Sequence, residues 1–449
     1  MYFLYSLLLT FAIFALLPLF LLDALRHGKY VAGLRERLGG VPETDAGGRA
    51  VLWLHCVSVG ETQAARPLAR ALIERFPTHA LVVSTTTLTG QTLAREVFRD
   101  DAVAVFYFPF DWAWSVRRTL RRIKPSLVLV LETELWPRFL RECRSAGVPV
   151  ALVNGRISEK SFRGYRKLGR FIKSVTGALT LAIMQTEADA ERIRALGLAT
   201  ERTRVSGNIK FDADTETDAG AITDELRERF AFGDEQPLIV AASTHAPEEA
   251  ITLEAFRQTR ASYDDRSKAP RLLIAPRHPE RFNEVAALLD ASGFTWARRS
   301  GSPQASDAAC DVVLLDSIGE LRGVYALAAL VFVGGSIAQT GGHNVLEPAA
   351  AARCIITGAH TFNFSSIMRD FLEQDALVQL PPLNETQAPA TLAQTFRELL
   401  SDDKRRRRTG ERARAALQQN RGATDKTIAL LAPLVEHRLE ARGRRSDKN

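Results

Sequence analysis

Short apolar runs alternate with helical stretches along the chain from Ala50 onward. The runs are continuous in Val, Leu and Ile rather than interrupted at every second position, which is typical of strands buried on both faces of a parallel sheet. The predicted strands of a first series are Val51–Val57, Leu81–Ser84, Val103–Phe108, Leu127–Leu131, Val148–Val153 and Leu181–Gln185. Predicted helices, such as Glu61–Phe76 and Thr89–Phe98, lie between them. The pattern therefore predicts an α/β domain with a doubly wound sheet over residues 36–212.

A second series of the same kind follows a polar stretch. Residues 213–233 are rich in Asp, Thr, Glu and Gly, which favours a linker between domains. The predicted strands beyond it are Leu238–Ala242, Leu272–Ala275, Val312–Leu315, Leu330–Val333 and Cys354–Thr357. We therefore expect a second Rossmann-like domain over 234–415, followed by a C-terminal helix and basic tail over 416–449. Ligands of such folds bind outside the carboxyl ends of the strands, so a site in a cleft between the two domains is expected.

The N-terminus carries an uncharged apolar run, Tyr2–Leu22. About 20 apolar residues suffice to cross a bilayer, so we expect residues 1–24 to form a membrane anchor. Basic residues follow the run and none precedes it, which places the rest of the chain in the cytoplasm. A cleavable signal peptide is disfavoured because the charged segment that should precede the apolar run is missing. Pro18 leaves a helix lying in the membrane interface as the alternative.

The composition narrows the function only slightly. The 449 residues are 46% hydrophobic and 25% charged, as in ordinary globular proteins, and the net charge is +7. That charge suits an anionic membrane, an acidic substrate or nucleic acid. The four cysteines are scattered without CxxC or Cys/His spacing, which argues against a zinc site and for a reducing compartment. No GxxxxGK[ST] or GxGxxG motif follows a predicted strand, so the usual nucleotide-binding signatures are missing.

Charged residues at the ends of predicted elements are candidates for catalysis in the first domain. Glu61 lies at the junction of the first strand and the first helix, where a carboxylate would face the expected cleft. The same carboxylate would also suit the positive end of the helix dipole. Glu132 and Glu134 follow another strand, so one could face the cleft while the other caps a helix. Lys210 lies near the domain junction, where it could reach a phosphate or carboxylate, or pair with Asp212.

A basic stretch lies between the predicted strands of the first domain. Its charged residues are Arg156, Lys160, Arg163, Arg166, Lys167, Arg170 and Lys173. The spacing of Arg163, Lys167 and Arg170 predicts that they share one face of a helix. Such a face is usually solvated, but beside an N-terminal anchor it could contact anionic lipid. Nucleic acid fits less well because few aromatic residues are interleaved.

Two segments of the second domain suit an anionic ligand. Arg277 stands in a turn between two prolines, and its planar guanidinium matches a phosphate. A glycine-rich loop follows the predicted strand Leu330–Val333 and leads into a predicted helix with Asn344 as its N-cap. Free N–H groups of the loop and of the helix start predict an anion site there. Glu347, one turn into the helix, could hold ribose hydroxyls of a nucleotide.

Taken together, these segments resemble the 3-deoxy-D-manno-oct-2-ulosonic acid (Kdo) transferases of lipopolysaccharide assembly. The motifs that carry the resemblance are Ser58-Val59-Gly60-Glu61, Glu132-Thr133-Glu134-Leu135-Trp136-Pro137, Gly207-Asn208-Ile209-Lys210-Phe211-Asp212, Ser243-Thr244-His245, Pro276-Arg277-His278-Pro279-Glu280-Arg281, Gly341-Gly342-His343-Asn344-Val345-Leu346-Glu347 and His360-Thr361-Phe362-Asn363-Phe364. So many motifs in one order are hard to obtain by chance. Two departures, Ala359 where the family often has proline and Cys56 where serine is expected, remove no proposed functional side chain.

The resemblance implies a GT-B fold and inverting transfer of Kdo from CMP-Kdo to a lipid A precursor, lipid IVA, at the cytoplasmic face of the inner membrane. It implies that Glu61 is the general base and that Glu132 and Lys210 stabilise the transition state. The residues that it implies for CMP binding are Pro276, Arg277, Ile318, Gly319, Glu320, Asn344, Val345, Leu346 and Glu347. No metal or cofactor is expected. The expected partners are CMP-Kdo, the lipid A precursor and inner-membrane lipids, without nucleic acid or an obligate protein partner.

Two other functions remain compatible with the sequence. One is another GT-B enzyme, a nucleotide-sugar epimerase or hydrolase that acts on a UDP-sugar and needs no membrane anchor. The other is a membrane-anchored scaffold that binds lipid through its basic surface.

Overall fold

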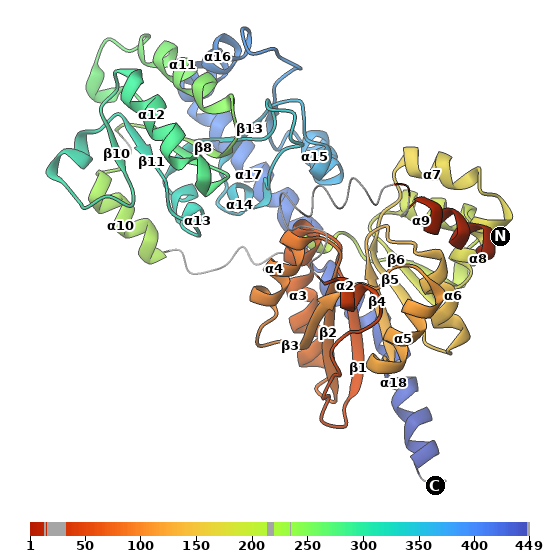
Figure 1. The fold of residues 1–449 in the computed structure, drawn as a ribbon. Coiled ribbons are helices and arrows are strands. Elements are labelled where there is room, and N and C mark those ends of the chain that lie inside the picture. The colour runs from red at the N-terminus through yellow and green to blue at the C-terminus, as the bar shows by residue number, and fades with distance from the viewer. Residues whose placement is uncertain (13–14, 16–32, 213–219, 234, 447–449) are drawn as a thin grey trace. The chain divides into compact units, whose positions relative to one another are not determined.

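The computed structural model describes residues 1–12, 15, 33–212, 220–233 and 235–446. The chain forms two compact units. Met1–Ala213 and Asn420–Asn449 make up the first unit, and Asp214–Gln419 make up the second. Each unit contains one seven-stranded sheet with helices on both of its faces (Figure 1).

The first unit has a doubly wound parallel sheet. Its strands are β1 (Ala50–His55), β2 (His79–Thr85), β3 (Ala102–Tyr107), β4 (Leu127–Leu131), β5 (Val150–Gly155), β6 (Leu181–Met184) and β7 (Thr203–Val205). Their order across the sheet is β3-β2-β1-β4-β5-β6-β7, and every neighbouring pair is parallel. The direction in which the chain adds strands reverses between β1 and β4, and open α/β sheets bind their ligands at such a reversal.

Burial on both faces explains why the strands read as continuous apolar runs. Successive residues of a strand point to opposite faces of the sheet. In β1, Trp53 therefore lies in one core with Phe139, whereas Leu52 and Leu54 lie in the core on the other face. The Trp53 and Phe139 rings meet edge to face at 5.2 Å. The indole N–H of Trp53 donates to Ser84 Oγ at 2.7 Å, so its polar atom is satisfied inside the core.

A helix from the C-terminal end of the chain completes the first unit. The helices of this unit are α2 (Leu34–Arg37), α3 (Val59–Arg75), α4 (Leu88–Val97), α5 (Ala113–Ile123), α6 (Pro137–Ser145), α7 (Glu159–Arg166), α8 (Arg170–Thr176), α9 (Glu187–Ala195) and α18 (Ala423–Ser446), with short 3-10 turns at η1 (Thr200–Arg202) and η2 (Ile209–Asp212). Ile428, Leu431 and Val435 of α18 are buried in the same core as Leu68 of α3. The chain therefore returns to its first unit, and the start of α18 belongs to that unit's core.

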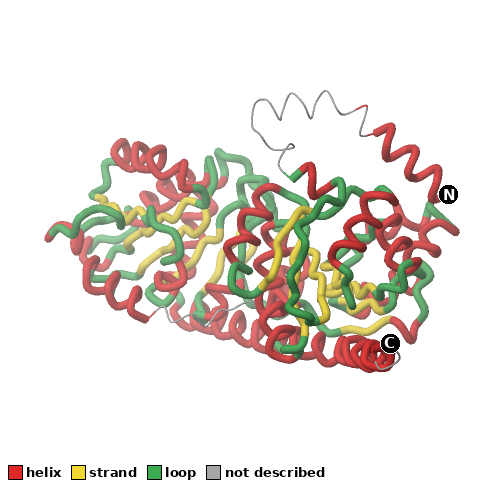
Figure 2. Tube along the Cα trace, turned by 60° about the horizontal axis from the view of Figure 1, so that its bottom comes forward, coloured by secondary structure: helices red, strands yellow, loops and turns green. Residues whose placement is uncertain are grey.

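The second unit has the same plan with another strand order. Its strands are β8 (Leu238–Thr244), β9 (Arg271–Pro276), β10 (Trp296–Arg298), β11 (Val312–Leu314), β12 (Ala328–Val333), β13 (Cys354–Thr357) and β14 (Val378–Gln379). The order across the sheet is β10-β11-β9-β8-β12-β13-β14, all parallel, so the reversal falls between β8 and β12. Figure 2 shows the strands of the described residues in yellow and the helices in red. The helices are α10 (Gly220–Phe230), α11 (Glu248–Arg260), α12 (Phe282–Ser292), α13 (Leu321–Tyr325), α14 (Leu346–Ala350), α15 (Ser365–Glu373), α16 (Ala388–Ser401) and α17 (Asp403–Asn420), with 3-10 turns at η3 (Arg266–Lys268), η4 (Pro279–Arg281), η5 (Ala305–Ala309) and η6 (Phe362–Phe364).

All strands predicted from the sequence are present, with ends that differ by at most two residues. Three further strands, β7, β10 and β14, were not predicted because two or three residues are too few to show a periodicity. The range 213–233, interpreted as a linker, contains the helix α10. Thr223, Leu226 and Phe230 of α10 are buried in the second unit, so this part of the range belongs to a folded domain.

The predicted basic face of a single helix is wrong. Gly169 has a φ of 50°, and the chain leaves α7 before this residue and begins α8 after it. Arg163 and Arg170 therefore lie on different helices. Arg163 pairs with Glu159 within α7 at 3.1 Å, and both side chains are exposed.

Residues 13, 14 and 16–24 of the expected membrane anchor, residues 1–24, lie outside the described residues. Residues 2–12 are helical. The hydroxyl of Tyr5 donates to Asp111 Oδ2 at 2.8 Å, and Thr10 Oγ1 accepts from Trp112 Nε1 at 3.0 Å. Several large apolar side chains of this helix are exposed, namely Phe3, Leu4, Leu7, Leu8 and Phe11. Within the described part of the chain, no helix combines the length and the apolar character needed to cross a membrane.

Candidate active site

Glu61 and Glu132 lie at the two strands where the order of the first sheet reverses. Glu61 is in the first turn of α3, which follows β1, and Glu132 follows directly on β4. Because β1 and β4 are parallel neighbours, their carboxyl ends meet at one edge of the sheet. The structure thus brings these two predicted residues to the edge where ligands of such folds bind.

The start of α3 holds the Glu61 side chain in place. Ser58 is the N-cap residue, and its Oγ accepts the Glu61 N–H at 3.4 Å. In return, the Glu61 carboxylate accepts the Ser58 hydroxyl at 3.2 Å and the Val57 N–H at 2.8 Å. This reciprocal arrangement resembles a capping box. The helix-stabilising role that the sequence left open for Glu61 is therefore present, and it coexists with a position at the ligand edge.

Burial raises the pKa of Glu61 from 4.5 to about 7. Only 9% of the residue is exposed, which disfavours the charged form of the carboxyl. The negative charge of Glu132, and to a lesser extent that of Glu134, raises the pKa further, whereas the hydrogen bonds from Val57 and Ser58 lower it. A carboxyl with a pKa near 7 is partly ionised at neutral pH and is basic enough to accept a proton, as a general base must.

Glu132 has an uncommon backbone conformation and is paired with Lys210. Its φ is 56°, in the left-handed region that a non-glycine residue adopts only at a cost of order 1–3 kcal/mol. Its Oε1 lies 2.6 Å from Lys210 Nζ, and the two side chains are only 18% and 20% exposed. Of the partners that the sequence allowed for Lys210, the structure therefore shows a carboxylate of the site rather than Asp212.

Asn154 and Asp212 fix the turn η2 that carries Lys210. Asn154 is the next-to-last residue of β5, and its Oδ1 accepts the Ile209 N–H at 3.1 Å. The Asp212 carboxylate accepts the N–H groups of Gly422 and Thr424 at 2.7 and 2.6 Å, at the start of α18. Lys210 is thus positioned from two sides, by the sheet and by the C-terminal helix.

In the second unit, a buried carboxylate fills the glycine-rich loop that follows β12. Glu248 is the first residue of α11 and is 0% exposed. Its carboxylate accepts the N–H groups of Gly335, Ser336, Ile337, Ala338 and His245 at 2.7, 3.0, 2.8, 3.1 and 3.0 Å. Burial raises the pKa of Glu248, and the N–H groups of the loop oppose that rise.

The prediction that this loop offers free N–H groups to an anion is therefore wrong for Gly335–Ala338. A carboxylate of the chain itself occupies them, and this could not be seen in the sequence because Glu248 lies far from the loop along the chain. The Glu248 carboxylate and the end of β8 lie very close to the backbone of the loop at Gly334. A Cβ added to Gly334 would lie 2.6 Å from Ser243 O and 2.8 Å from Glu248 Oε2. Only glycine fits such a position.

The other residues that are expected to bind the nucleotide lie near the ends of several strands. Pro276 is the last residue of β9, and the exposed Arg277 follows it. The Arg277 N–H donates to Thr244 O at 3.0 Å, which ties the turn to the end of β8. Ile318 is 82% exposed, and Gly319 beside it has a φ of 91°. All of these residues lie in the second unit, at or beyond the carboxyl ends of its strands.

Both acidic residues expected at the nucleotide are paired with arginines. Two hydrogen bonds of 2.8 and 3.0 Å join the Glu320 carboxylate to Arg299. Burial, which alone would raise the pKa of Glu320, is outweighed by the hydrogen bonds from Arg299 and Ser317, so the pKa is lowered. Glu347 Oε1 lies 3.5 Å from Arg322 Nε. A ligand that used either carboxylate would share it with an arginine.

The predicted helix beyond the glycine-rich loop begins later than expected. Helix α14 starts at Leu346, so Asn344 is not its N-cap, although Asn344 Oδ1 still accepts the Leu346 N–H at 3.0 Å. Val345 and Leu346 are almost fully buried. Their side chains therefore pack in the core, and only their backbone is available to a ligand.

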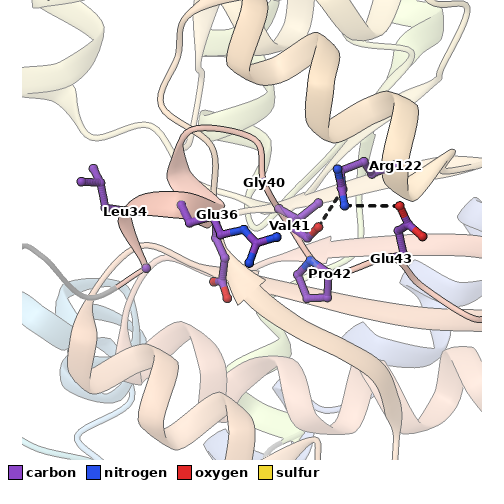
Figure 3. A pocket seen from close by; sticks show the side chains of 9 residues that line it. Leu34, Glu36, Gly40, Val41, Pro42, Glu43 and Arg122 are labelled. Carbon is purple, nitrogen blue, oxygen red and sulfur yellow. Dashed lines mark hydrogen bonds and ion pairs between the residues drawn. The ribbon is translucent and has the colours of Figure 1, made fainter.

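A pocket of about 630 Å³ in the first unit contains none of the predicted site residues. Its lining residues are Gly33, Leu34, Arg35, Glu36, Gly40, Val41, Pro42, Glu43 and Arg122 (Figure 3). Arg122 donates to the Val41 carbonyl at 2.9 Å and to Glu43 Oε1 at 3.3 Å, as the dashed lines in Figure 3 mark.

Two residues that hold the site together were missed from the sequence, Asn154 and Glu248. Each lies at or shortly after the carboxyl end of a predicted strand, and that was the available signal. Their partners lie 55 and up to 90 residues further along the chain, so what they bind could not be predicted from the sequence.

Comparison with known proteins identifies the family. Residues 32–213 match the family model of the 3-deoxy-D-manno-octulosonic-acid transferases (kdotransferases). The chain is 34% identical over 413 residues to the 3-deoxy-D-manno-octulosonic acid transferase of Haemophilus influenzae, with 92% of this chain and 94% of the relative covered. The chain belongs to this family. It is therefore a glycosyltransferase, as the resemblance of its motifs implied.

Solved structures show the fold of this Kdo transferase family member but do not distinguish its chemistry. A glycosyltransferase from Rickettsia africae is 11% identical, with a TM-score of 0.54 and with 86% of this chain and 99% of that chain covered. The UDP-GlcNAc 2-epimerase of Neisseria meningitidis is 12% identical, with a TM-score of 0.58 and coverage of 86% and 100%. Two parallel α/β units that resemble GT-B enzymes are common to all three.

Proposed function

We propose that the protein transfers Kdo from CMP-Kdo to the lipid A precursor lipid IVA, with inversion at the anomeric carbon and with Glu61 as general base. One observation carries the proposal. At the reversal of the first sheet, burial and then the charge of Glu132 raise the pKa of the Glu61 carboxyl to about 7, and Glu132 is itself paired with Lys210. Membership of the family supplies the sugar, because the Haemophilus influenzae relative is named for its transfer.

In this reaction Glu61 accepts the proton of the acceptor hydroxyl as that hydroxyl attacks the anomeric carbon. The raised pKa matters in two ways. It makes the carboxylate a stronger base, and it keeps an ionised fraction at neutral pH. The hydrogen bonds from Val57 and Ser58 orient the carboxylate without removing its capacity to accept a proton.

The Glu132–Lys210 pair suits the charges that develop in glycosyl transfer. Positive charge builds up at the sugar ring in the transition state, and a fixed carboxylate such as Glu132 stabilises it. Negative charge builds up on the leaving phosphate, and the donor sugar also carries a carboxylate, so Lys210 offers the opposite charge to these groups. Both side chains are mostly buried, which strengthens their electrostatic effect compared with a solvated pair.

On the donor side, CMP lies against the strand ends of the second unit. Because Glu248 occupies the N–H groups of Gly335–Ala338, the donor phosphate must find its positive partner elsewhere, and the exposed Arg277 is placed for that role. Backbone groups at Ile318–Gly319 and Asn344–Leu346 contact the nucleotide, and Glu347 accepts hydrogen bonds from the ribose.

The acceptor is a lipid, and the N-terminal residues fit attachment to the cytoplasmic face of the inner membrane. Phe3, Leu7 and Phe11 are among the exposed apolar side chains of the helix over residues 2–12. Beside this helix, Arg141 and Arg144 line a pocket of about 540 Å³ together with Tyr2, and they offer positive charge to anionic headgroups. Co-sedimentation of the protein with vesicles of anionic phospholipid measures this attachment. Equal binding after replacement of Phe3, Leu7 and Phe11 by serine would argue against this attachment.

The decisive experiment is a transfer assay with CMP-Kdo and lipid IVA, with the product identified by mass spectrometry. Wild-type protein is expected to form the Kdo-bearing lipid, and Glu61→Gln is expected to lower the rate by at least about 100-fold, because removal of a general base costs 10²–10⁴-fold. Glu74→Gln changes an exposed glutamate of the same helix and serves as the matched control. Full activity of Glu61→Gln would refute the role of the base.

The alternative of an enzyme that acts on a UDP-sugar is separated by ligand-induced stabilisation. A ligand present at 100 times its Kd stabilises the folded protein by about 2.7 kcal/mol. We expect CMP to raise the unfolding temperature and UDP to leave it nearly unchanged. The opposite ranking would favour the epimerase or hydrolase.

A further inference from the structure

Three histidines of the second unit come from three adjacent strands. His245 follows β8, His278 follows β9, and His343 lies in the loop between β12 and α14. In the sheet, β9, β8 and β12 are consecutive neighbours, so the three side chains leave the same edge around the strand reversal. None of the three is among the residues proposed above for catalysis or for CMP binding.

The rings of His245 and His343 form a hydrogen-bonded pair. Their ring planes are parallel within 1°, their centroids lie 5.0 Å apart, and their Nε2 atoms face each other at 2.7 Å. Two imidazole nitrogens at this distance share one proton, so one ring donates and the other accepts. His278 stands edge-on to His245 at 5.1 Å and is 48% exposed in its side chain.

The buried Glu248 positions both members of the pair. Its Oε2 accepts the backbone N–H of His245 at 3.0 Å and the backbone N–H of Gly335 at 2.7 Å. Gly335 in turn lies against the His343 ring, since an added Cβ there would be 2.8 Å from His343 Cδ2 and 3.0 Å from Nε2. The pair is therefore a preorganised element of the loop.

The charged groups around the pair leave an excess of positive charge on its exposed side. Arg281 is neutralised by Glu249 and Glu284, at 2.5 and 2.8 Å. Burial lowers the pKa of both His245 and His343 and brings that of His343 to about 3. The charges of His278 and of the exposed Arg277 lower both values further, and Arg281 also lowers that of His245, whereas Glu249 partly opposes the shift of His245. His343 is therefore neutral at pH 6–8 in the free protein, and an anion beside Arg277 would favour a further proton on the pair.

We propose that the His245–His343 pair is the proton-accepting part of the donor-phosphate site, so that binding of the CMP phosphodiester beside Arg277 is accompanied by uptake of one proton. This inference rests on the proposed function, because it takes CMP-Kdo as the donor. A nearby anion favours the protonated form of imidazole, which is the reverse of the effect of Arg277 in the free protein. The two rings hold the extra proton while they keep the hydrogen bond between them.

The stored proton has a use in the transfer step. The bond between the anomeric carbon and the phosphate oxygen breaks, and the acceptor oxygen forms the new bond to that carbon. The acceptor proton goes to Glu61, and the proton of the histidine pair goes to the departing phosphate oxygen. CMP then leaves as a monoanion, and the pair returns to its neutral state. Neutralisation of the leaving group in this way lowers the barrier as general acid catalysis does.

The test is calorimetric titration of the full chain with the methyl ester of CMP, a phosphodiester that does not itself titrate near neutrality. At pH 6.0, in buffers of different ionisation enthalpy, wild-type protein is expected to take up about one proton for each ligand bound. Cytidine, which has the same base without the phosphate, is the control ligand and should cause no uptake. In His343→Gln and His245→Gln the uptake should fall to near zero, with unfolding temperatures measured to confirm that both variants fold. His278→Gln should keep the uptake, because His278 is outside the hydrogen-bonded pair.

Each outcome has a definite meaning. Binding of the methyl ester without proton uptake would overturn the inference and leave the proposed function intact. Undiminished uptake in both pair variants, or its loss in His278→Gln alone, would assign the proton to another group and also overturn it. No binding of the methyl ester at all would overturn the inference together with the proposed donor.

Discussion

Replacement of Glu61 by glutamine is expected to make the protein more stable at pH 8 while it removes transfer activity. The carboxyl is buried at 9% exposure, and its pKa rises from 4.5 to about 7. At about 1.4 kcal/mol for each pH unit, this rise corresponds to roughly 3 kcal/mol of free energy. Glutamine has nearly the same shape as the protonated side chain, so its amide oxygen can still accept the Val57 N–H.

The sign of the effect follows from proton binding. The folded state holds the Glu61 proton more tightly than the unfolded state, so stability is greatest below pH 4.5 and is lost as pH rises to about 7. The neutral glutamine does not follow this loss. The difference between variant and wild type should therefore be near zero at pH 4.5, grow to about 3 kcal/mol near pH 7 and stay constant above it.

Chemical unfolding of the full chain at pH 5 and pH 8 measures this difference. Glu74→Gln, at an exposed position of the same helix α3, is the matched control and should unfold like wild type at both values. A Glu61→Gln protein that is no more stable than wild type at pH 8 would refute the reasoning, because the carboxyl would then carry no burial penalty. Equal stabilisation of Glu61→Gln at both pH values would also contradict the reasoning. Such a result would indicate a change in packing, which does not depend on pH.

Further predictions concern the other charges of the two units. The rate of transfer at low substrate concentration should fall about tenfold for each pH unit below pH 7, because only ionised Glu61 acts as a base; a rate that levels off at pH 5 would contradict the raised pKa. Lys210→Met should reduce transfer by at least about 100-fold, measured as kcat/KM, because it removes a charge aimed at the transition state. Glu248→Ala should destabilise the protein by about 3 kcal/mol or more in chemical unfolding, since it leaves four buried N–H groups and the part-buried N–H of His245 without their acceptor. Asp212→Ala should lower the free energy of unfolding by about 1 kcal/mol in chemical unfolding, because α18 loses the carboxylate that caps it. A metal chelator should leave the rate of transfer unchanged in the mass-spectrometric assay.

The strands and their order of appearance were predictable because burial on both sheet faces leaves a direct trace in the sequence. Val128 and Leu129 of β4, for example, lie in cores on opposite faces, so both had to be apolar. The placement of Glu61 and Glu132 at one edge followed from the same pattern, since each comes at the end of a strand.

Predictions failed where the deciding contact was distant in sequence or where one residue changed the backbone. The helix α10 was taken for a linker because its buried positions, such as Leu226 and Phe230, are few and lie among charged residues. Gly169 ends a run that by spacing alone looked like one helix. The pKa of Glu61 was equally out of reach, because it depends on burial and on Glu132, whose closeness requires the folded sheet.

The two units place a carboxylate in the same way and use it differently. In each, a glutamate in the first turn of the helix after the first strand lies at the strand reversal, Glu61 after β1 and Glu248 after β8. A carboxylate has about four positions for accepted hydrogen bonds. Five N–H groups occupy all of those on Glu248, so it has no capacity left and acts as a fixed internal anion. Glu61 accepts two hydrogen bonds within the described part of the chain, from Val57 and Ser58, which leaves room for a proton. The number of donors around each carboxylate, rather than its place in the fold, therefore separates the proposed base from the structural anion.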